Sequence, residues 1–507
     1  FSIRALAKGI ALTFFLSQQF FAGHIQVFAY SLVIYLLYFT RNFCIKKTYT
    51  KFGIISLICV AIVFLLVILV QLVPLAELYL QSNRINETSK WLQEGWFLPW
   101  QHLVQFIAPD FFGNPATLNY WGVWNYGELV GYVGIIPLAF AIFAILSRLG
   151  KRTILFGLAF FVSLLFALPN PISKLPFILD IPFLSAAQPT RLLFVTCFSL
   201  AILSAFGFDY FIKEHFENNK KEILSKLVFS IVIVGVLLTI IWCVVLFGAQ
   251  TTSIDNLLVS KKNLLLPTAL FGLFAGMCLV NSFLNLRKIK QLIVIFVIVF
   301  ATLDLVRFAN KFDPFVSRDY LFPSTAAIEF LQKQPGIFRI ASLDSRLLPP
   351  NFATQYRLQS ISGYDPLFLN SYAQYVSAME RNKPNIDPPY GFNRIIEPRN
   401  YESPLFDLLS VKYVLSLDEI DSPKLKKVFE EGMTKIYENK SVVPRVYFVE
   451  TVEWVDTKQN AIDALFQHDT DASSSAVIVK PNIKQEREII TTNITKGTAE
   501  ITYYSEN

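Results

Sequence analysis

Long apolar runs recur along the first part of the chain, up to about residue 309. A helix that crosses a bilayer needs about 20 mostly apolar residues, because each residue adds only about 1.5 Å to its length. The runs therefore predict nine membrane spans, at roughly 3–20, 25–41, 52–75, 129–147, 153–169, 191–212, 227–248, 264–285 and 291–308. Only the segment FAGHIQ separates the first two, which predicts a tight helical hairpin or one broken helix.

After residue 309 the pattern changes to alternating helix and strand signals, which are typical of an α/β domain. Helices are expected over 324–334, 403–410, 422–432 and 456–468, and strands over 338–343, 411–417, 434–439 and 445–455. A hairpin pattern with a Lys-Gly turn follows at 487–505. The expected domains are a polytopic transmembrane domain at 1–309, an extracytoplasmic α/β domain at 310–483 and the start of a truncated β-rich module at 484–507.

Composition agrees with a membrane protein. Apolar residues make up 53% of the chain, charged residues only 16%, and the mean hydropathy is +0.46. Soluble domains have about 25% charged residues, and a soluble chain this apolar would expose large apolar patches. Residues 1–309 hold 23 Lys+Arg and 12 Asp+Glu, a net +11, whereas residues 310–507 hold 22 and 26, a net −4. The overall +7 therefore does not indicate nucleic-acid binding, because the excess lies between apolar runs.

Lys and Arg are concentrated in alternate connections between the predicted spans. The connections 41–51, 148–152, 213–226 and 286–290 hold four, three, four and three basic residues, and Arg4 and Lys8 add two more. The opposite connections 76–128, 170–190 and 249–263 hold only five. Because cytoplasmic loops carry the excess of positive charge, the first set is expected in the cytoplasm. Residues after 310 are then expected outside it.

The ends of the chain and its cysteines add to this interpretation. The chain begins at Phe1 inside an apolar run and stops at Asn507 within a strand pattern, so we expect a fragment cut at both ends. It has no signal-peptide pattern with a cleavage site. All five cysteines lie in or beside predicted spans, so the outer domain is not a disulfide scaffold. The expected location is a prokaryotic plasma membrane.

The sequence contains none of the common motifs of soluble enzymes. It has no Walker A loop, no GxSxG, no HExxH and no CxxC. Its four histidines, at 24, 102, 215 and 468, are too scattered to indicate a metal site. No cofactor is required by the sequence, and a divalent metal is an unsupported alternative.

The long connection 76–128 combines aromatic rings with carboxylates. It holds five of the seven tryptophans, at 91, 96, 100, 121 and 124, and acidic residues at 77, 87, 94, 110 and 128. The tryptophans predict either an interfacial aromatic belt or a stacking surface for a sugar or a lipid head group. The carboxylates are candidates for general-base or metal chemistry.

Six segments together resemble one bacterial family, the YfhO-type membrane proteins. In the first half they are AGHIQVFAYSL (22–32), PDFFGNP with YWGVWNYGELVGYVGIIPL (within 109–137) and QPTRLLFVTCFSLAILSAFGFDYF (188–211). In the second half they are SGYDPLFLNSYAQY (362–375), LFDLLSVKYVL (405–415) and VPRVYFV (443–449). The resemblance covers nearly the whole chain.

YfhO-type proteins are similar to GT-C glycosyltransferases, so the resemblance implies a GT-C-like multi-pass fold. It also implies transfer of a sugar from a polyprenyl-phosphate donor to a cell-envelope glycopolymer, such as teichoic acid, on the outer face. In GT-C enzymes the catalytic Asp or Glu lies in the first external loop, which we expect upstream of Phe1. The catalytic base is therefore unknown, and Asp110 and Glu128 are the weak candidates within this chain.

Five polar residues at the predicted outer side are candidate substrate or catalytic groups. His24 and Gln26, at the turn of the first hairpin, either satisfy helix-end backbone groups or point into a substrate cavity. Asp110 precedes an aromatic turn and is either a loop cap or a cavity carboxylate. Tyr126 and Glu128 lie where a loop enters a span, so they suit either head-group binding or anchoring at the interface.

Arg191 begins a span from the outside, after the Pro-rich connection 170–190. Its guanidinium suits a phosphate diester by bidentate contact, or else it extends to lipid head groups. Asp304 and Arg307 share a helical face and form either a structural ion pair or a functional site within a span. Tyr364 and Asp365 predict a turn, which in the functional interpretation covers the membrane cavity and meets the acceptor.

The expected function is therefore glycosyl transfer by an integral membrane protein. An acceptor hydroxyl would attack the anomeric carbon, an upstream carboxylate would take its proton, and Arg191 would steady the departing phosphate. The partners are the bilayer, the polyprenyl-phosphate sugar donor and the glycopolymer acceptor, with no nucleic acid. Two alternatives remain open, a transporter or flippase of lipid-linked sugars and a non-catalytic envelope-assembly protein. The spans hold few charges at mid-depth, which favours the enzyme over a transporter.

Overall fold

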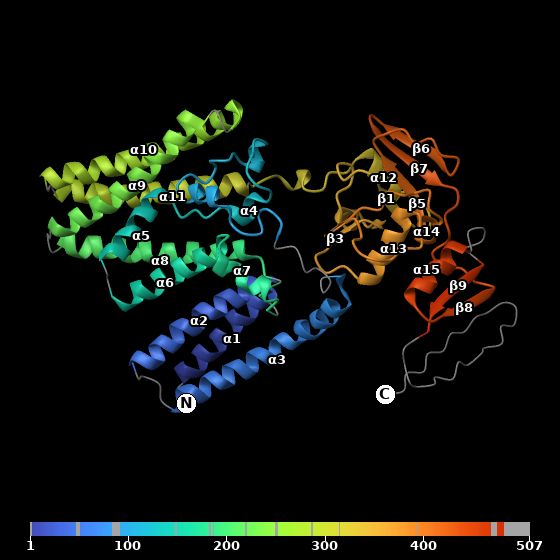
Figure 1. Cartoon of the computed structure of the whole chain (residues 1–507), viewed down its shortest axis with the longest axis horizontal. Helices are drawn as coiled ribbons and strands as arrows, with labels where there is room; N and C mark the ends of the chain where they lie inside the picture. The colour runs from blue at the N-terminus through green and yellow to red at the C-terminus, as the bar shows by residue number, and fades with distance from the viewer. Residues whose placement is uncertain are drawn as a thin grey trace. The chain divides into compact units, whose positions relative to one another are not determined.

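The computed structural model describes residues 3–46, 51–83, 92–147, 150–181, 184–185, 187–217, 221–248, 252–284, 287–313, 315–392, 394–467 and 474–480. The chain divides into two compact units. Unit 1 comprises Phe1–Leu80 and Ile85–Leu321, and unit 2 comprises Gln81–Arg84 and Phe322–Asn507. Figure 1 shows that long helices dominate the first of these and that the strands belong to the second.

In the first 312 residues, every long element that the structure describes is a helix (Figure 1). The long helices are α1 (Ile3–Phe21), α2 (Ile25–Lys46), α3 (Lys51–Gln81), α5 (Ile135–Ser147), α6 (Lys151–Ala167), α8 (Leu193–Phe211), α9 (Lys221–Phe247), α10 (Ile254–Leu284) and α11 (Arg287–Phe312). Shorter elements are η3 (Trp100–Phe106), η4 (Pro115–Thr117), α4 (Tyr126–Leu129), α7 (Pro171–Ile178), η5 (Pro189–Leu192) and the π-helical η6 (Ile212–Glu217).

Each predicted span overlaps one of these long helices. By length and composition, five helices among the described residues can cross a membrane, namely Ile54–Gln81, Pro189–Glu214, Ile223–Phe247, Ile254–Asn281 and Gln291–Phe312. The number becomes six if α6 and α7, bent by 64° at their junction, form one broken span. Ile25–Thr40 and Ile135–Ser147 are shorter apolar helices. The full count of nine crossings, and which side each loop faces, remain predictions.

Two helices differ from the sequence-based expectation in ways that have clear causes. Helix α10 begins at Ile254, ahead of the predicted start at 264, because its polar first turns are satisfied by the loop that they pack against. There Ser260 donates to the Phe111 carbonyl and Asn263 to the Asp110 carbonyl. Helix α7 lies within the Pro-rich connection 170–190, where Asn170 forms a capping box and Pro171 occupies the first helical turn.

The core of unit 1 is built around α5, most of whose residues are buried. Helix α5 packs against α8, α9 and α10. Phe140 on α5 makes aromatic contacts with Phe208 on α8 and Phe274 on α10. At Gly207 the backbones of α8 and α5 come so close that a Cβ atom would lie 2.2 Å from the Phe140 carbonyl oxygen. The close approach explains why α8 carries a glycine there.

The connection 92–125 is a folded segment and not an open loop. Its apolar residues, among them Leu98, Phe106 and Phe111, belong to the same buried cluster as α5. Trp96 and Phe97 pack with Phe177 of α7 in a second small cluster. Trp91 and Glu87, part of the predicted aromatic and acidic loop, lie outside the described residues. The segment therefore contributes its apolar side chains to the core of unit 1.

Unit 2 is an α/β unit in which a five-stranded mixed sheet has the order β2-β1-β5-β7-β6 (Figure 1). Strand β1 pairs in parallel with β2 and β5, whereas β7 is antiparallel to β5 and β6. The strands are β1 (Arg339–Ser342), β2 (Gln359–Ser360), β3 (Gly363–Tyr364), β4 (Ile395–Ile396), β5 (Val411–Ser416), β6 (Leu425–Glu431), β7 (Thr434–Asn439), β8 (Thr451–Val455) and β9 (Ser475–Val479). The helices are α12 (Ala326–Gln332), η9 (Phe352–Tyr356), α13 (Asn370–Arg381), α14 (Pro404–Leu408) and α15 (Lys458–Gln467), and η8 (Arg318–Tyr320) precedes them.

Most element predictions in unit 2 are confirmed, and two are corrected. The helix predicted over 422–432 is wrong, because Leu425–Glu431 forms strand β6 in a hairpin with β7. Gly432 adopts φ +58° in the turn, and Phe429 packs on Phe330 of α12, so edge pairing and apolar packing outweigh the helix-favouring Lys and Glu residues. The strand predicted over 445–455 is regular only from Thr451. The module expected at 484–507 lies outside the described residues.

Candidate functional site

Arg191 sits at the start of α8, where η5 joins the helix, and holds two other predicted residues. Its Nε donates to Glu128 Oε1 at 3.3 Å, and its Nη1 donates to Gln26 Oε1 at 2.8 Å. The Arg191 and Glu128 side chains are only 17% and 23% exposed. A partly buried guanidinium with a carboxylate and an amide around it is an ordered group and not a freely moving surface charge.

Gln26 and His24 complete the polar side of this arrangement. The Gln26 amide donates to the Gln188 carbonyl at 2.7 Å and lies 2.6 Å from the Tyr30 hydroxyl, so it ties α2 to η5. His24 lies in the turn before α2, and its Nδ1 accepts from the Val27 amide at 3.4 Å. Burial, followed by the Arg191 charge, lowers the pKa of His24. The imidazole is therefore neutral at neutral pH and can accept a proton or a hydrogen bond.

His24, Glu128 and Arg191 line a cavity of about 710 Å³, whereas Gln26 lies behind Arg191 and does not line it. Its polar lining includes His24, Glu128, Thr190 and Arg191. The opposite wall is apolar and comes largely from one face of α8, with Leu193, Phe194, Cys197, Phe198 and Ala201. A cavity of this size, with a few polar groups at one end of an apolar wall, is typical of a ligand site. The arrangement suits an amphipathic molecule whose polar part meets Arg191.

Thr190 is a site residue that the sequence analysis missed. Its side chain is fully buried, it lines the cavity, and its Oγ1 has no hydrogen-bond partner among the described residues. A buried hydroxyl without a partner costs free energy unless a ligand or water completes it. The neighbouring Arg191 keeps guanidinium N–H groups that are not used by Glu128 or Gln26. Together these two residues offer unused donors for an anionic oxygen atom.

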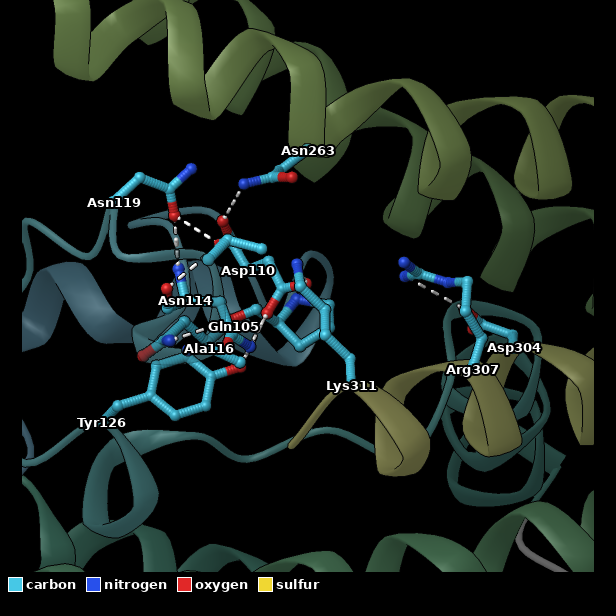
Figure 2. A network of polar contacts seen from close by, with 12 residues as sticks. Gln105, Asp110, Asn114, Ala116, Asn119, Tyr126, Asn263, Asp304, Arg307 and Lys311 are labelled. Carbon is cyan, nitrogen blue, oxygen red and sulfur yellow. Dashed lines mark hydrogen bonds and ion pairs between the residues drawn. The ribbon is translucent and has the colours of Figure 1, made fainter. Parts of the chain in front are cut away.

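Asp110 lies in a separate polar network, shown in Figure 2. Its Oδ2 accepts from Lys311 Nζ at 2.7 Å, and its Oδ1 accepts from the Asn114 amide at 2.8 Å and the Tyr126 hydroxyl at 2.7 Å. Asn263 of α10 donates to the Asp110 backbone carbonyl at 2.6 Å. The side chain of Asp110 is 5% exposed. This network ties the folded connection to α10 and α11.

The Asp110 network leaves its carboxylate with little capacity for catalysis. Three donors already occupy it, and burial together with the Asp110 charge raises the pKa of Tyr126, which keeps that phenol protonated as a donor. Neither Asp110 nor Tyr126 belongs to the lining of the 710 Å³ cavity. The contacts favour the loop-cap interpretation of Asp110 and a structural role for Tyr126.

Asp304 and Arg307 form the ion pair expected from their spacing, at 3.9 Å (Figure 2). Asp304 is buried and also accepts from the Tyr132 hydroxyl. Tyr132 and Leu305, the residue after Asp304, line the cavity. The ion pair is therefore connected to the cavity lining through the Tyr132 hydroxyl, which donates to Asp304.

Tyr364 and Asp365 belong to unit 2, where Tyr364 ends strand β3 and Asp365 begins the turn that follows. Both backbone groups of Tyr364 bond to the Asn351 side chain, and Asp365 Oδ1 accepts from the Leu367 amide at 2.8 Å. These contacts are those of a self-capped turn. The proposed meeting of this turn with an acceptor stays a prediction.

Among the described residues, no group of three or more His, Cys, Asp or Glu is arranged to hold a metal ion. The metal requirement of any reaction stays untested. In unit 1 the structure thus brings His24, Gln26, Glu128 and Arg191 together, and it places Asp110 and Tyr126 in a second cluster.

Comparisons with known proteins give one strong result. The family model described as "Bacterial membrane protein YfhO" matches residues 9–505, which is nearly the whole chain. A comparison with curated proteins gives no match, and a comparison with solved structures gives none either.

Proposed function

Because the chain belongs to the YfhO family of bacterial membrane proteins, we propose that it is a membrane glycosyltransferase of the GT-C type. In this proposal it takes a sugar from a polyprenyl-phosphate donor and transfers it to a cell-envelope glycopolymer, such as teichoic acid, on the outer face of the membrane. The observation that carries the proposal is the Arg191 guanidinium at the polar end of an otherwise apolar cavity.

The cavity matches the two chemical parts of such a donor. The phosphate would meet the unused N–H groups of Arg191 and the unpartnered Thr190 hydroxyl. The prenyl chain would run along the apolar face of α8. From Leu193 to Ala201 this face extends roughly 12 Å at about 1.5 Å per residue. An apolar wall of that depth beside a fixed cation favours a lipid phosphate over a free sugar nucleotide.

The reaction would be a direct displacement at the sugar. The acceptor hydroxyl attacks the anomeric carbon, the bond from that carbon to the phosphate oxygen breaks, and polyprenyl phosphate leaves with the electron pair. Negative charge grows on the departing oxygen, where Arg191 and Thr190 would stabilise it. Glu128 is the carboxylate in the cavity lining and the candidate to take the acceptor proton.

The test uses the full chain in nanodiscs with a panel of radiolabelled polyprenyl-phosphate hexoses and isolated envelope glycopolymer. Label transferred to the polymer gives kcat and KM. Arg191→Ala should remove about 2–4 kcal/mol of transition-state stabilisation, which lowers kcat/KM roughly 30- to 900-fold. Arg191→Lys should recover only part of the lost rate, because lysine keeps the positive charge but cannot form the two parallel hydrogen bonds of a planar guanidinium.

The matched control is Arg152→Ala, which removes an exposed arginine at the start of α6 and should leave the rate unchanged. Equal rates of transfer in wild type and Arg191→Ala would show that Arg191 does not bind the donor phosphate. With the chain in proteoliposomes, movement of labelled donor from one leaflet to the other without transfer to polymer would instead support the flippase alternative.

A further inference from the structure

Two arginines of unit 2 lie beside each other at the β1–β2 edge of the sheet. Arg339 on β1 is directly opposite Gln359 on β2, so their side chains share one face. Arg445 Nη2 donates to Gln359 Oε1 at 3.0 Å, and Arg339 Nη1 donates to the Leu409 carbonyl at 2.9 Å. Gln359 therefore holds the Arg445 guanidinium beside the strand position of Arg339.

Neither guanidinium has an acidic partner within the described part of the chain. Other arginines of unit 2 do, since Arg346 pairs with Asp344 at 2.5 Å and Arg399 pairs with Glu397 at 3.2 Å. Burial, followed by the Arg445 charge, lowers the pKa of Arg339. Two neighbouring like charges repel each other, and an anion that lies between them relieves the repulsion.

The surroundings of the pair come from three segments that were singled out in the sequence. Tyr372 and Tyr375, from the segment 362–375, lie near Arg339. The Leu409 carbonyl belongs to the segment 405–415, and Arg445 belongs to the segment 443–449. Both tyrosine hydroxyls donate to backbone carbonyls, of Ile361 and Leu405. These bonds fix the rings and leave the arginines as the free donors.

We infer that Arg339 and Arg445 form a binding site for a phosphodiester. Each guanidinium retains N–H donors after its bonds to the Leu409 carbonyl and Gln359, and a phosphodiester presents two anionic oxygens that two guanidinium groups can share. The phosphodiester can come from a phospholipid head group or from a soluble molecule. The inference does not depend on glycosyl transfer, because it concerns binding by unit 2 alone.

The experiment measures binding to the purified full chain in neutral detergent and low-salt chloride buffer. One arm titrates glycerophosphoglycerol, a soluble phosphodiester, by calorimetry. The other arm titrates dioctanoyl phosphatidylglycerol, with dioctanoyl phosphatidylcholine as the zwitterionic control. We expect saturable binding in at least one arm, weakened at least tenfold by Arg445→Gln, which alters an exposed side chain and should not affect folding.

Arg339→Lys provides a second variant that keeps the charge and should weaken binding less than Arg339→Gln. The matched control is Arg346→Gln, because Arg346 is already paired with Asp344. Binding to both probes assigns a soluble or lipid-borne phosphodiester, and binding to the lipid alone assigns a head group. No saturable binding in either arm, or equal loss in Arg346→Gln and Arg445→Gln, would overturn the inference.

Discussion

The Asp110 network allows a sharp prediction about the stability of unit 1. Substituting Asn for Asp110 removes the negative charge that Lys311 contacts at 2.7 Å. It also replaces one acceptor oxygen by an NH2 group, and this donor then faces the donor group of Asn114 or of Lys311. The variant keeps the size of the side chain, so its effect reports charge and hydrogen bonding and not packing.

The magnitude follows from the burial of the two partners. Removing one member of a buried ion pair costs about 3–5 kcal/mol, because the other charge is left unpaired. The Lys311 side chain is 24% exposed and can be partly hydrated, whereas Asp110 is only 5% exposed. We therefore expect the lower end, about 3 kcal/mol. At about 2–4 °C per kcal/mol, the apparent Tm should fall by roughly 6–12 °C.

The assay is thermal unfolding of the purified chain in nanodiscs, compared at one scan rate because membrane proteins unfold irreversibly. Asp209→Asn is the matched control, since Asp209 and Lys213 form a pair at 2.9 Å with side chains 62% and 59% exposed. An exposed pair contributes about 0–1 kcal/mol. Adding Lys311→Met to Asp110→Asn should recover part of the loss by removing the unpaired charge. Equal shifts for Asp110→Asn and Asp209→Asn would refute the anchoring role.

Three further predictions concern packing, pH and orientation. Gly207→Ala should destabilise unit 1 by about 1–3 kcal/mol through overpacking against Phe140, whereas Gly276→Ala, with open space around it, should be nearly neutral in the same unfolding assay. Burial raises the pKa of Tyr372 from 10.0 to about 12, so the unfolded chain releases this proton first and stability should fall as pH rises from 10 to 12. The loss is up to about 2.7 kcal/mol, and Tyr372→Phe should flatten that part of the pH profile of unfolding. Labelling of intact cells with an impermeant thiol reagent should reach a cysteine placed at Lys333 but not one placed at Asn219, and the reverse pattern would contradict the predicted orientation.

The helices of unit 1 could be predicted because their signal is local. A long apolar run has few ways to bury itself, and its hydropathy is visible in the sequence alone. The start of α10 was placed too late for the converse reason. Its first turns carry Ser260 and Asn263, whose polar groups are satisfied by carbonyls of a segment about 150 residues earlier in the chain. Such a partner cannot be read from the local pattern.

Strand β6 was predicted as a helix because its local signals conflict. Lys and Glu favour helices, and the apolar positions Leu425, Val428 and Phe429 fit a helical face as well as a strand with a bulge. The pairing with β7 includes a register shift between Lys427 and Phe429, and Val428 and Phe429 both pack in the cluster that contains α12 residues, whereas Leu425 belongs to the other buried cluster of unit 2. The decision is thus made by the neighbouring strand and not by propensity.

Individual residues of the cavity were found because charge and amide groups are unusual beside apolar runs. Their assembly was not predictable, because Arg191 is separated in the sequence from Glu128 by 63 positions and from Gln26 by 165. Thr190 was missed because a hydroxyl is common in any loop and gives no signal of its own. Its importance comes only from full burial without a partner.

The two candidate carboxylates, Asp110 and Glu128, differ in whether their oxygen atoms are free to take part in a reaction. In the sequence Asp110 and Glu128 are equivalent, because both are acidic residues of one long connection. In the structure Asp110 accepts from three side-chain donors, so taking a proton would break bonds that hold the connection to α11. Glu128 lines the cavity, and among the described residues its ion pair is with Arg191, the residue expected to bind phosphate. A phosphate on the remaining N–H groups of Arg191 would lie beside Glu128. The carboxylate proposed to take the acceptor proton and the cation proposed to stabilise the leaving group would therefore act at one site.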